Sequence, residues 1–558
     1  MAAGQPEQAG PDQSAAAQPG PSVRAGPAAP VDSTGPGRGH RVLRWQGRRR
    51  RPTPYLVLSG LAVLGAVALS LRRPWGADFG LHVATVGRLV DDLWHPGNPM
   101  VESAANGPYV TPYTLVLALV ARVTGAPAAV VLSAAAPVNL ALLLYGLRRF
   151  VGLFTADPWA PVLALFFVPL LWGTAVLSWS GFPTLRGLVL ILPYPSTLGL
   201  ALLLLGWVAL ARAAAGPTPG RWILVGLLGG LLVLVHPFTA LGAALGSLAL
   251  VVGRLVRTPY RRAGDGTVLA ELRGLSLALA LAVLVVLVWP YFRVTDLLTR
   301  AGDLDPIHRP LYLDPLARYG FGFVVGLPAL AVRLCRDRLD PLVLLFGLAG
   351  LPVLLGGLTG GYALGRLWPV VLVSLQVAAA VELVRALRRA KAAPGLRVRT
   401  VVTGLWAGAA ALAVLAGLAL QYGNLLLVLP RDQLTSARRA AYRISPPPDR
   451  AWVAREVPPG AVLLTADPAV GRDLLRYRIR AVAPPWPDPL LPDQARRRAD
   501  QAALLDPSTP VPRRTALLAG YGVDWVLEPA GGFPWLDRYA TRVVPGPGGL
   551  RLVRLTPG

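Results

Sequence analysis

The sequence predicts an all-α polytopic membrane bundle of about 11–13 transmembrane helices, followed by a small extracytoplasmic α/β domain at the C-terminus. Of the 558 residues, 54% are hydrophobic and only 15% are charged, whereas soluble domains contain roughly 25% charged residues. The mean hydropathy is +0.50. Apolar runs near the spanning length of about 17–25 residues recur along the chain, and short Arg clusters separate them.

The chain begins with a polar segment. Residues 1–36 are rich in Ala, Gly, Pro, Gln and Ser and have no apolar periodicity, which predicts a disordered N-terminal cytoplasmic tail over residues 1–40. A basic run at 38–51 precedes the first apolar run, so the positive-inside rule favours a cytoplasmic N-terminus. A multi-span transmembrane domain is then expected over residues 41–429, with a large first outer loop at 72–112.

The predicted spans follow from the apolar runs. These runs cover residues 54–71, 127–147, 158–179, 196–210, 222–235, 237–252, 275–291, 319–334, 341–358, 367–387 and 401–422. Two shorter pieces, 112–123 and 185–194, are expected to be half-spans, re-entrant segments or tightly coupled helices. About eleven spans result if neither short piece crosses the membrane, and about thirteen if both do.

The Arg distribution predicts the orientation. Arg-bearing connections lie at 211–221, 254–273, 333–338 and 385–399, and we assign them to the cytoplasm. The segments 292–318 and 359–366, and everything after residue 422, are then outside, which requires an odd number of spans. The protein is therefore expected in the plasma membrane, with its N-terminus cytoplasmic and its C-terminal domain extracytoplasmic. The lipid bilayer is its first predicted partner.

The composition changes at residue 430, where Leu-rich sequence gives way to Arg, Asp and Pro. We expect an extracytoplasmic α/β domain over residues 430–558. Its predicted helices are 450–456, 493–505 and 513–519. Its predicted strands are 461–465, 477–482, 524–528 and 550–555.

Several function classes have no support in the sequence. The formal net charge of +26 comes from Arg runs beside apolar segments rather than from a basic domain, so we expect no nucleic acid partner. The single cysteine, Cys335, excludes an intramolecular disulfide and a multi-cysteine metal site. The chain has no GxSxG, P-loop or HExxH motif, so a serine hydrolase, ATPase or zincin has no support.

The first outer loop concentrates ionisable side chains. Asp78 and His82 are four residues apart, which places them on one face of a helix, where a carboxylate and an imidazole can act as a base, orient a proton or bind a metal. The alternative is an amphipathic interfacial helix with its polar face in water. Asp91, Asp92 and His95 are secondary candidates. Adjacent helical residues diverge, so at least one of the two aspartates is expected to be solvated.

Two further candidates lie at predicted helix ends. His236 interrupts an apolar stretch, and an ionisable residue there must face a cavity, a partner or the interface. Arg366 begins a long span, where it either snorkels to the interface or binds an anion such as phosphate. Residues 179–183 (WSGFP) and 194–196 (YPS) place aromatic, Gly and Pro residues at a membrane border, as in a sugar-stacking or lipid-entry wall or in a simple helix break.

The outer segment 292–318 contains Asp303, Asp305 and His308. A DxD sequence can hold a divalent cation that bridges phosphates, which is the one cofactor that the sequence suggests. The alternative is a solvated polar loop. The identity of any metal stays open.

The residues in this order resemble the GT-C class of integral-membrane glycosyltransferases. The similarity rests on Asp78 with His82 in the first outer loop, on residues 108–113 (PYVTPY), on His236-Pro237, on Arg366, and on residues 517–527 (LLAGYGVDWVL). That class often has paired acids in this loop, whereas Phe79 follows Asp78. Asp91 or Asp92 is therefore an alternative counterpart of the class carboxylate.

The resemblance implies inverting transfer of a sugar from a polyprenyl-phosphate carrier to an extracytoplasmic cell-envelope acceptor. Asp78 would be the general base, and His82 would orient it or the donor. Arg366 and His236 would bind the donor phosphate and stabilise it on departure. Two alternatives are a transporter of a lipid-linked substrate, which needs polar groups at mid-membrane, and a non-catalytic scaffold. Convergence of Asp78, His236 and Arg366 in the fold would favour the enzyme.

Overall fold

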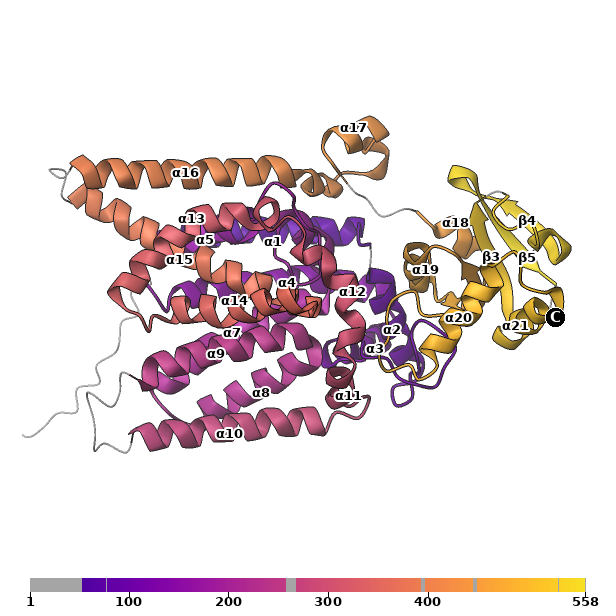
Figure 1. Cartoon of the computed structure of the whole chain (residues 1–558), viewed down its shortest axis with the longest axis horizontal. Helices are drawn as coiled ribbons and strands as arrows, with labels where there is room; N and C mark the ends of the chain where they lie inside the picture. The colour runs from indigo at the N-terminus through magenta and orange to yellow at the C-terminus, as the bar shows by residue number, and fades with distance from the viewer. Residues whose placement is uncertain are drawn as a thin grey trace, which may run out of the picture. The chain divides into compact units, whose positions relative to one another are not determined.

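A computed structural model describes residues 53–76, 78–256, 267–392, 397–444, 449–529 and 531–556. The tail predicted at 1–40 and the basic run at 38–51 lie outside these residues. Most of the described chain is a helical bundle (Figure 1). A small domain with a β-sheet follows it in the sequence.

Nine helices among the described residues are long and apolar enough to cross a membrane. They are α1 (Pro54–Arg72), α4 (Ala128–Val151), α7 (Pro195–Ala215), α9 (Pro237–Leu255), α10 (Thr267–Leu287), α13 (Pro315–Arg336), α14 (Pro341–Thr359), α15 (Trp368–Ala392) and α16 (Arg397–Gln421). Three apolar helices are shorter: α3 (Pro112–Thr124), α5 (Trp159–Leu170) and α8 (Pro219–Val235). The predicted polytopic membrane bundle is confirmed.

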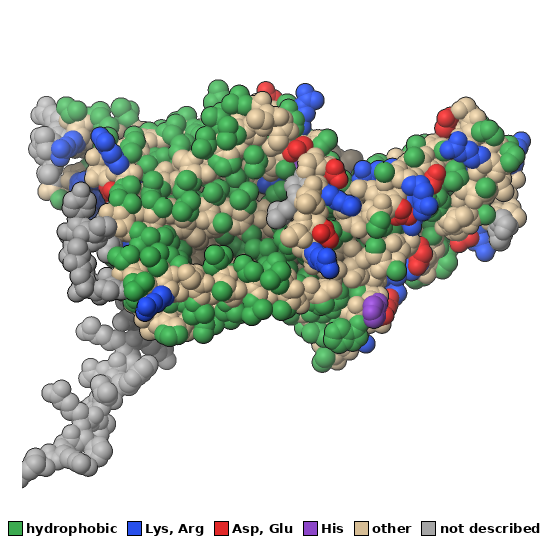
Figure 2. Space-filling model, turned by 60° about the horizontal axis from the view of Figure 1, so that its bottom comes forward, with side chains coloured by type: hydrophobic (Ala, Val, Ile, Leu, Met, Phe, Trp, Pro, Cys, Tyr) green, Lys and Arg blue, Asp and Glu red, His purple; other side chains and the backbone are tan. Residues whose placement is uncertain are grey.

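The surface of the bundle is typical of a protein in lipid. Leu64, Leu358 and Leu405 are 65–75% exposed, and Figure 2 shows hydrophobic side chains spread over the bundle. Water would oppose this exposure, whereas hydrocarbon does not. The core helix is α15, which packs against α5, α13, α14 and α16. By contrast, α16 lies along the outside of the bundle (Figure 1).

The two short pieces do not have the length of a span. Helix α3 has 13 residues and α6 (Leu185–Ile191) has 7, about 20 and 11 Å at 1.5 Å per residue, against a hydrocarbon core of about 30 Å. Helix α5, with 12 residues, is no longer than α3, so length alone does not separate the predicted counts of about eleven and about thirteen spans. The number of spans stays a prediction.

The predicted helix 158–179 is wrong beyond Leu170, where α5 ends. The next residues form irregular backbone, of which residues 171–173 are buried in protein. Gln376 Nε2 donates to the Leu171 carbonyl (3.0 Å), and the Phe321 amide donates to the Trp172 carbonyl (2.9 Å). Irregular backbone is tolerated at membrane depth when neighbouring helices satisfy it in this way. The consequence is that residues 171–184 reach the functional site as a loop.

The C-terminal domain contains a five-stranded sheet in the order β2-β1-β3-β5-β4. Its strands are β1 (Val462–Thr465), β2 (Arg480–Ala481), β3 (Val523–Pro529), β4 (Ala540–Pro545) and β5 (Leu550–Leu555). β1 runs parallel to β2 and β3, and β5 is antiparallel to β3 and β4. Leu464, Val526 and Val553 are fully buried in its core. The predicted α/β class is confirmed.

Four helices belong to this domain: α18 (Ala451–Glu456), α19 (Pro468–Leu474), α20 (Gln494–Leu505) and α21 (Val511–Tyr521). Helix α19 and strand β4 were not predicted from the sequence, and the strand predicted at 477–482 is only two residues long. Helix α19 is the important omission. It packs against α2 (Phe79–Asp91), the helix of the first outer loop.

Candidate functional site

Asp78 lies at the N-terminal end of α2, and its side chain is 22% exposed. Its backbone carbonyl accepts from the His82 amide (3.0 Å), whereas its side chain makes no cap hydrogen bond. Instead, Oδ1 accepts from Arg472 Nη1 of α19 at 3.3 Å. Burial raises the pKa of the Asp78 carboxyl, and the positive charges of Arg472 and Arg366 oppose that rise. Asp78 is therefore a carboxylate with enhanced basicity.

His82 lies one turn further along α2 and is 7% exposed. Its ring meets the rings of Tyr194 and Tyr109 edge-on, with centroids 5.1 and 6.3 Å away. Its Nδ1 atom is buried and has no hydrogen-bond partner within the described chain. Burial lowers the pKa of His82 to about 3. The imidazole is therefore neutral at ordinary pH, so it can position a group but cannot provide a positive charge.

His236 joins α8 to α9 and pairs with Arg366. Its Nδ1 atom lies 2.7 Å from Thr239 Oγ1, and its Nε2 atom lies 3.2 Å from Arg366 Nη2. Nδ1 also accepts from the Thr239 amide (3.3 Å) at the start of α9, and Nε2 faces the Arg366 guanidinium. The Arg366 guanidinium also lies over the Phe238 ring, 5.0 Å from its centroid. Arg366 is thus held between a histidine and an aromatic face, rather than extended toward the interface.

The segment that bears Arg366 is fixed by a residue of the DxD sequence. Arg366 belongs to the 3-10 turn Tyr362–Leu367. The Ala363 amide of this turn donates to Asp305 Oδ1 at 2.6 Å. Asp303 is exposed. Asp305 therefore has a structural partner in the turn that bears Arg366, whereas the Asp303 side chain lies at the surface.

His308 lies beside the Arg366 cluster. It is 3% exposed, and its Nδ1 atom lies 2.7 Å from the Leu304 carbonyl. Its ring is 5.4 Å from that of Phe238 and 5.8 Å from that of Trp179. Burial and the charge of Arg366 lower the pKa of His308 to about 4. Trp179, from the predicted aromatic border, and His308 thus form one wall next to Arg366.

Loop residues connect the two clusters. The Tyr194 hydroxyl donates to the Gly76 carbonyl, just before Asp78. Ser196 Oγ accepts from Ser180 Oγ (2.9 Å). Gly181, the residue after Ser180, has φ +79°, and a Cβ there would lie 3.5 Å from atoms of both Arg366 and His236. The segment 179–181 therefore runs closely against the Arg–His pair.

Asp78, His82, His236, Arg366 and His308 lie close enough to influence one another electrostatically, and His236 contacts Arg366 directly. The secondary candidates of the first loop, Asp91, Asp92 and His95, are not part of this cluster. Asp91 pairs with Arg478 at the surface. Asp92 is exposed, and its Oδ1 atom accepts from the Trp94 and His95 amides (2.9 Å each), which lowers its pKa. His95 is exposed as well.

A resident metal has no support in the geometry. Within the described ranges, no group of three or more His, Cys, Asp or Glu side chains is placed to hold a metal ion. Asp78 and Asp305 each already face a nitrogen donor. We therefore assign no step of a reaction to a cation.

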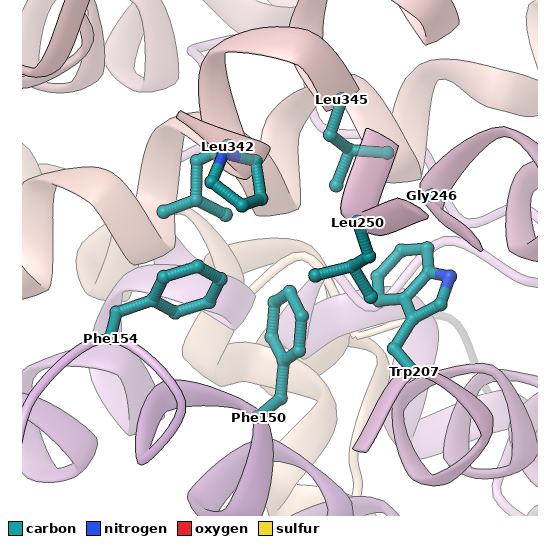
Figure 3. Close-up of a pocket in the computed structure, with 8 residues that line it drawn as sticks. Phe150, Phe154, Trp207, Gly246, Leu250, Leu342 and Leu345 are labelled. Atoms are coloured by element: carbon teal, nitrogen blue, oxygen red, sulfur yellow. The ribbon is translucent and has the colours of Figure 1, made fainter. Parts of the chain in front are cut away.

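A pocket with an empty volume of about 180 Å³ lies elsewhere in the bundle (Figure 3). It is lined by Phe150, Phe154, Trp207, Gly246, Leu250, Pro341, Leu342 and Leu345. Leu250 is fourteen residues after His236, so it lies about 21 Å further along α9. The lining contains no acid, base or charged group. This pocket is separate from the site described above.

Two residues next to the site, Arg472 and Trp486, were not predicted from the sequence. Arg472 reaches Asp78 from 394 positions away, and the Arg472 guanidinium lies over the ring of Trp486 at 4.6 Å. Both residues belong to the C-terminal domain. A single sequence contains no signal for a contact of this kind, because neither residue follows a motif or a periodicity.

The fold resembles solved glycosyltransferase structures. Oligosaccharyltransferase AglB from Archaeoglobus fulgidus, in complex with an inhibitory peptide and a dolichol-phosphate, aligns with a TM-score of 0.51 and 12% identity over 90% of this chain and 74% of that chain. ArnT from Cupriavidus metallidurans, bound to undecaprenyl phosphate, gives 0.49 and 16% over 89% and 97%. No protein-family model and no curated protein matches the chain. The alignment with AglB confirms the predicted GT-C fold.

Proposed function

We propose that this protein transfers a sugar from a polyprenyl-phosphate donor to a hydroxyl group of an extracytoplasmic cell-envelope acceptor. The observation that supports this most strongly is the convergence of Asp78, His236 and Arg366. The partly buried Asp78 carboxylate lies close enough to the Arg366 charge for that charge to oppose the rise of its pKa. A base beside a phosphate-binding cation is what glycosyl transfer from a lipid phosphate needs.

The reaction uses these residues in one displacement. Asp78 takes the proton of the acceptor hydroxyl, and the acceptor oxygen forms a bond to the anomeric carbon of the sugar. The bond from that carbon to the phosphate oxygen breaks, and polyprenyl phosphate leaves with the electron pair. Arg366 stabilises the charge on the departing phosphate, and His236 holds Arg366. Attack opposite the leaving group inverts the anomeric configuration.

His82 and His308 act without changing charge. Burial keeps both imidazoles neutral, so neither adds a second positive charge beside Arg366. We assign His82 to the positioning of Asp78 or of the donor. His308, with Trp179 and Phe238, forms an aromatic wall that shields the Arg366 cluster.

The site faces outward in this proposal. Basic residues end helices α4, α7, α9, α13 and α15, namely Arg148, Arg149, Arg212, Arg254, Arg333, Arg336, Arg389 and Lys391. His236 and Arg366 instead lie at the beginnings of α9 and α15. The positive-inside rule assigns the basic ends to the cytoplasm. The N-terminus is then cytoplasmic, and the C-terminal domain is extracytoplasmic.

A glycolipid analysis of a deletion strain tests the proposal. We expect the strain to accumulate a polyprenyl-phosphate sugar and to lack one sugar in a cell-envelope glycan. The wild-type gene should restore both, and an Asp78→Asn gene expressed to the same level should restore neither. Unchanged glycolipids and glycans in the deletion strain would contradict the proposal.

A further inference from the structure

The C-terminal domain contacts the N-terminal turn of α2 at backbone distance. Gly80 follows Asp78 by two residues, and a Cβ built on it would lie 2.3 Å from the Arg472 carbonyl oxygen. It would also lie 3.2 Å from the Arg476 amide nitrogen and from the Asp473 carbonyl oxygen. Any side chain here would separate the two segments. Glycine thus permits α19 to lie directly against the turn that bears Asp78.

Two arginines of this segment hold the turn. Arg476 Nη2 donates to the Trp75 carbonyl (3.0 Å), and its guanidinium lies 5.4 Å from the centroid of the Phe79 ring. Arg472 contacts Asp78 between them. Arg472 is itself held from behind by Trp486, and its side chain is 19% exposed. The residues before, at and after the carboxylate are therefore all fixed by the C-terminal domain.

A second set of contacts holds the other part of the first loop. The Ala481 amide, at the edge of the sheet in β2, donates to the Met100 carbonyl (2.9 Å). Arg497 Nη2 donates to the Glu102 carbonyl (2.8 Å), and the Asn98 side-chain amide donates to Asp488 (2.8 Å). Residues 98–102 thus lie against the edge of the sheet at β2 and against the segments beside it. The C-terminal domain therefore contacts the first loop at the start of α2 and again after α2.

We infer that Arg472 is a positioning residue for Asp78, so that the C-terminal domain completes the active site of the membrane bundle. Its guanidinium holds Oδ1 in place and leaves Oδ2 to take the proton of the acceptor hydroxyl. This inference rests on the proposed function, because it assumes that Asp78 is the base. A carboxylate held by a fixed partner keeps its productive orientation, which is worth more than the pairing energy itself.

The charges around Asp78 support the role of Arg472. The titratable groups near the carboxyl come from several elements and are Arg472 and Arg476 of the C-terminal domain, Arg366, His82, Tyr109 and Tyr194. Burial raises the pKa of Asp78, and Arg472 is the strongest opposing influence. Removal of Arg472 should therefore raise that pKa further. The lost charge alone accounts for this rise, whereas a positioning role also predicts a lower turnover number at pH values where Asp78 is ionised in both proteins.

The test is an infrared titration of the full-length protein in lipid nanodiscs. The C=O band of protonated Asp78 is isolated by subtracting the spectrum of Asp78→Asn. We expect its midpoint to rise by about one pH unit or more in Arg472→Gln, as for the loss of a close opposite charge, and to rise less in Arg472→Lys. Arg478→Gln is the matched control, because it breaks a surface ion pair between the same domain and the same helix. It should leave the midpoint unchanged.

The transfer rate separates this inference from the proposed function. If the wild type transfers sugar, Arg472→Gln should lower the turnover number about tenfold and move the acid limb of its pH profile by the same shift as the infrared midpoint. Arg478→Gln should do neither. An inactive wild type would overturn the proposed function, whereas equal infrared midpoints in Arg472→Gln and wild type would overturn the role of Arg472. Melting curves confirm that each variant is folded.

Discussion

Replacement of Gly80 by alanine should separate the C-terminal domain from the candidate base. A methyl group at this position would lie 2.3 Å from the Arg472 carbonyl oxygen, whereas carbon–oxygen contacts are normally no shorter than about 3.3 Å. The segment that bears Arg472 must therefore move by about 1 Å. Overpacking of this kind costs about 1–3 kcal/mol, and the better helix propensity of alanine offsets roughly 0.5–1 kcal/mol of it. The net destabilisation should be up to about 2.5 kcal/mol.

The effect on turnover should be larger than the effect on stability. A misplacement of about 1 Å in a catalytic group can lower a rate about 100-fold. Gly87→Ala on the same helix is the matched control, since a Cβ there would meet nothing within 4 Å. It should stabilise the protein by roughly 0.5–1 kcal/mol and leave the rate unchanged.

Thermal unfolding in one detergent and the rate of sugar transfer are the two measurements. We expect Gly80→Ala to melt below the wild type and to transfer slowly, and Gly87→Ala to melt at or above the wild type with full activity. A Gly80→Ala protein with the melting midpoint and rate of the wild type would refute the direct packing of α19 on α2.

Three further predictions concern the charges of the site. Arg366→Ala should lower the single-turnover release of polyprenyl phosphate by about 10²–10³-fold, and a rate equal to the wild type would exclude Arg366 from the donor phosphate. Asp305→Ala should lower the rate about tenfold by freeing the turn that bears Arg366, while Asp303→Ala should not. If both substitutions lowered the rate equally and added Mg²⁺ restored it, the DxD sequence would instead be a cation site. Because burial raises the pKa of Asp78 and lowers that of His82 to about 3, the rate should fall as the pH drops through the Asp78 pKa, above the usual value of about 3.9. A pH–rate profile that stays flat down to pH 4 would contradict this.

Hydropathy and charge predicted the membrane bundle correctly because spanning helices have a length and composition that the bilayer imposes. The same reasoning failed at residues 171–179, where the run is apolar but the carbonyls of Leu171 and Trp172 accept from Gln376 and Phe321 rather than from their own helix. Apolar composition alone does not distinguish these two ways of burying a segment. The difference matters, because this loop leads to Gly181 beside Arg366 and His236.

The candidate residues of the site were predictable in part. Spacing placed Asp78 and His82 on one face of α2. Asp91 and Asp92 are both exposed, and at least one of them was predicted to be solvated. The association of His308 with Arg366 had no signal in the sequence. It depends on a contact between segments 58 residues apart, in which the Ala363 amide donates to the Asp305 carboxylate. Local patterns identify individual groups, whereas the fold determines which groups meet.

Helix α19 shows the same limit for the C-terminal domain. Its seven residues, PAVGRDL, have little apolar periodicity, and their Pro and Gly residues are typical of a turn. An aspartate cap at Asp467, whose side chain accepts from the Ala469 amide (2.8 Å), starts the helix. Tertiary packing on α2 then orients Arg472 toward Asp78. Helix propensity does not predict this packing of α19 on α2.

The most direct test of the central claim is the release of polyprenyl phosphate by purified protein from a synthetic polyprenyl-phosphate sugar, measured with an acceptor extract from the deletion strain. The wild type and the surface variant Asp92→Asn should release polyprenyl phosphate at the same rate, with the sugar appearing in inverted configuration on the acceptor. Asp78→Asn should be slower by about 10²–10⁴-fold, the usual contribution of a general base. Release by Asp78→Asn at the wild-type rate, or no release by the wild type, would contradict the account.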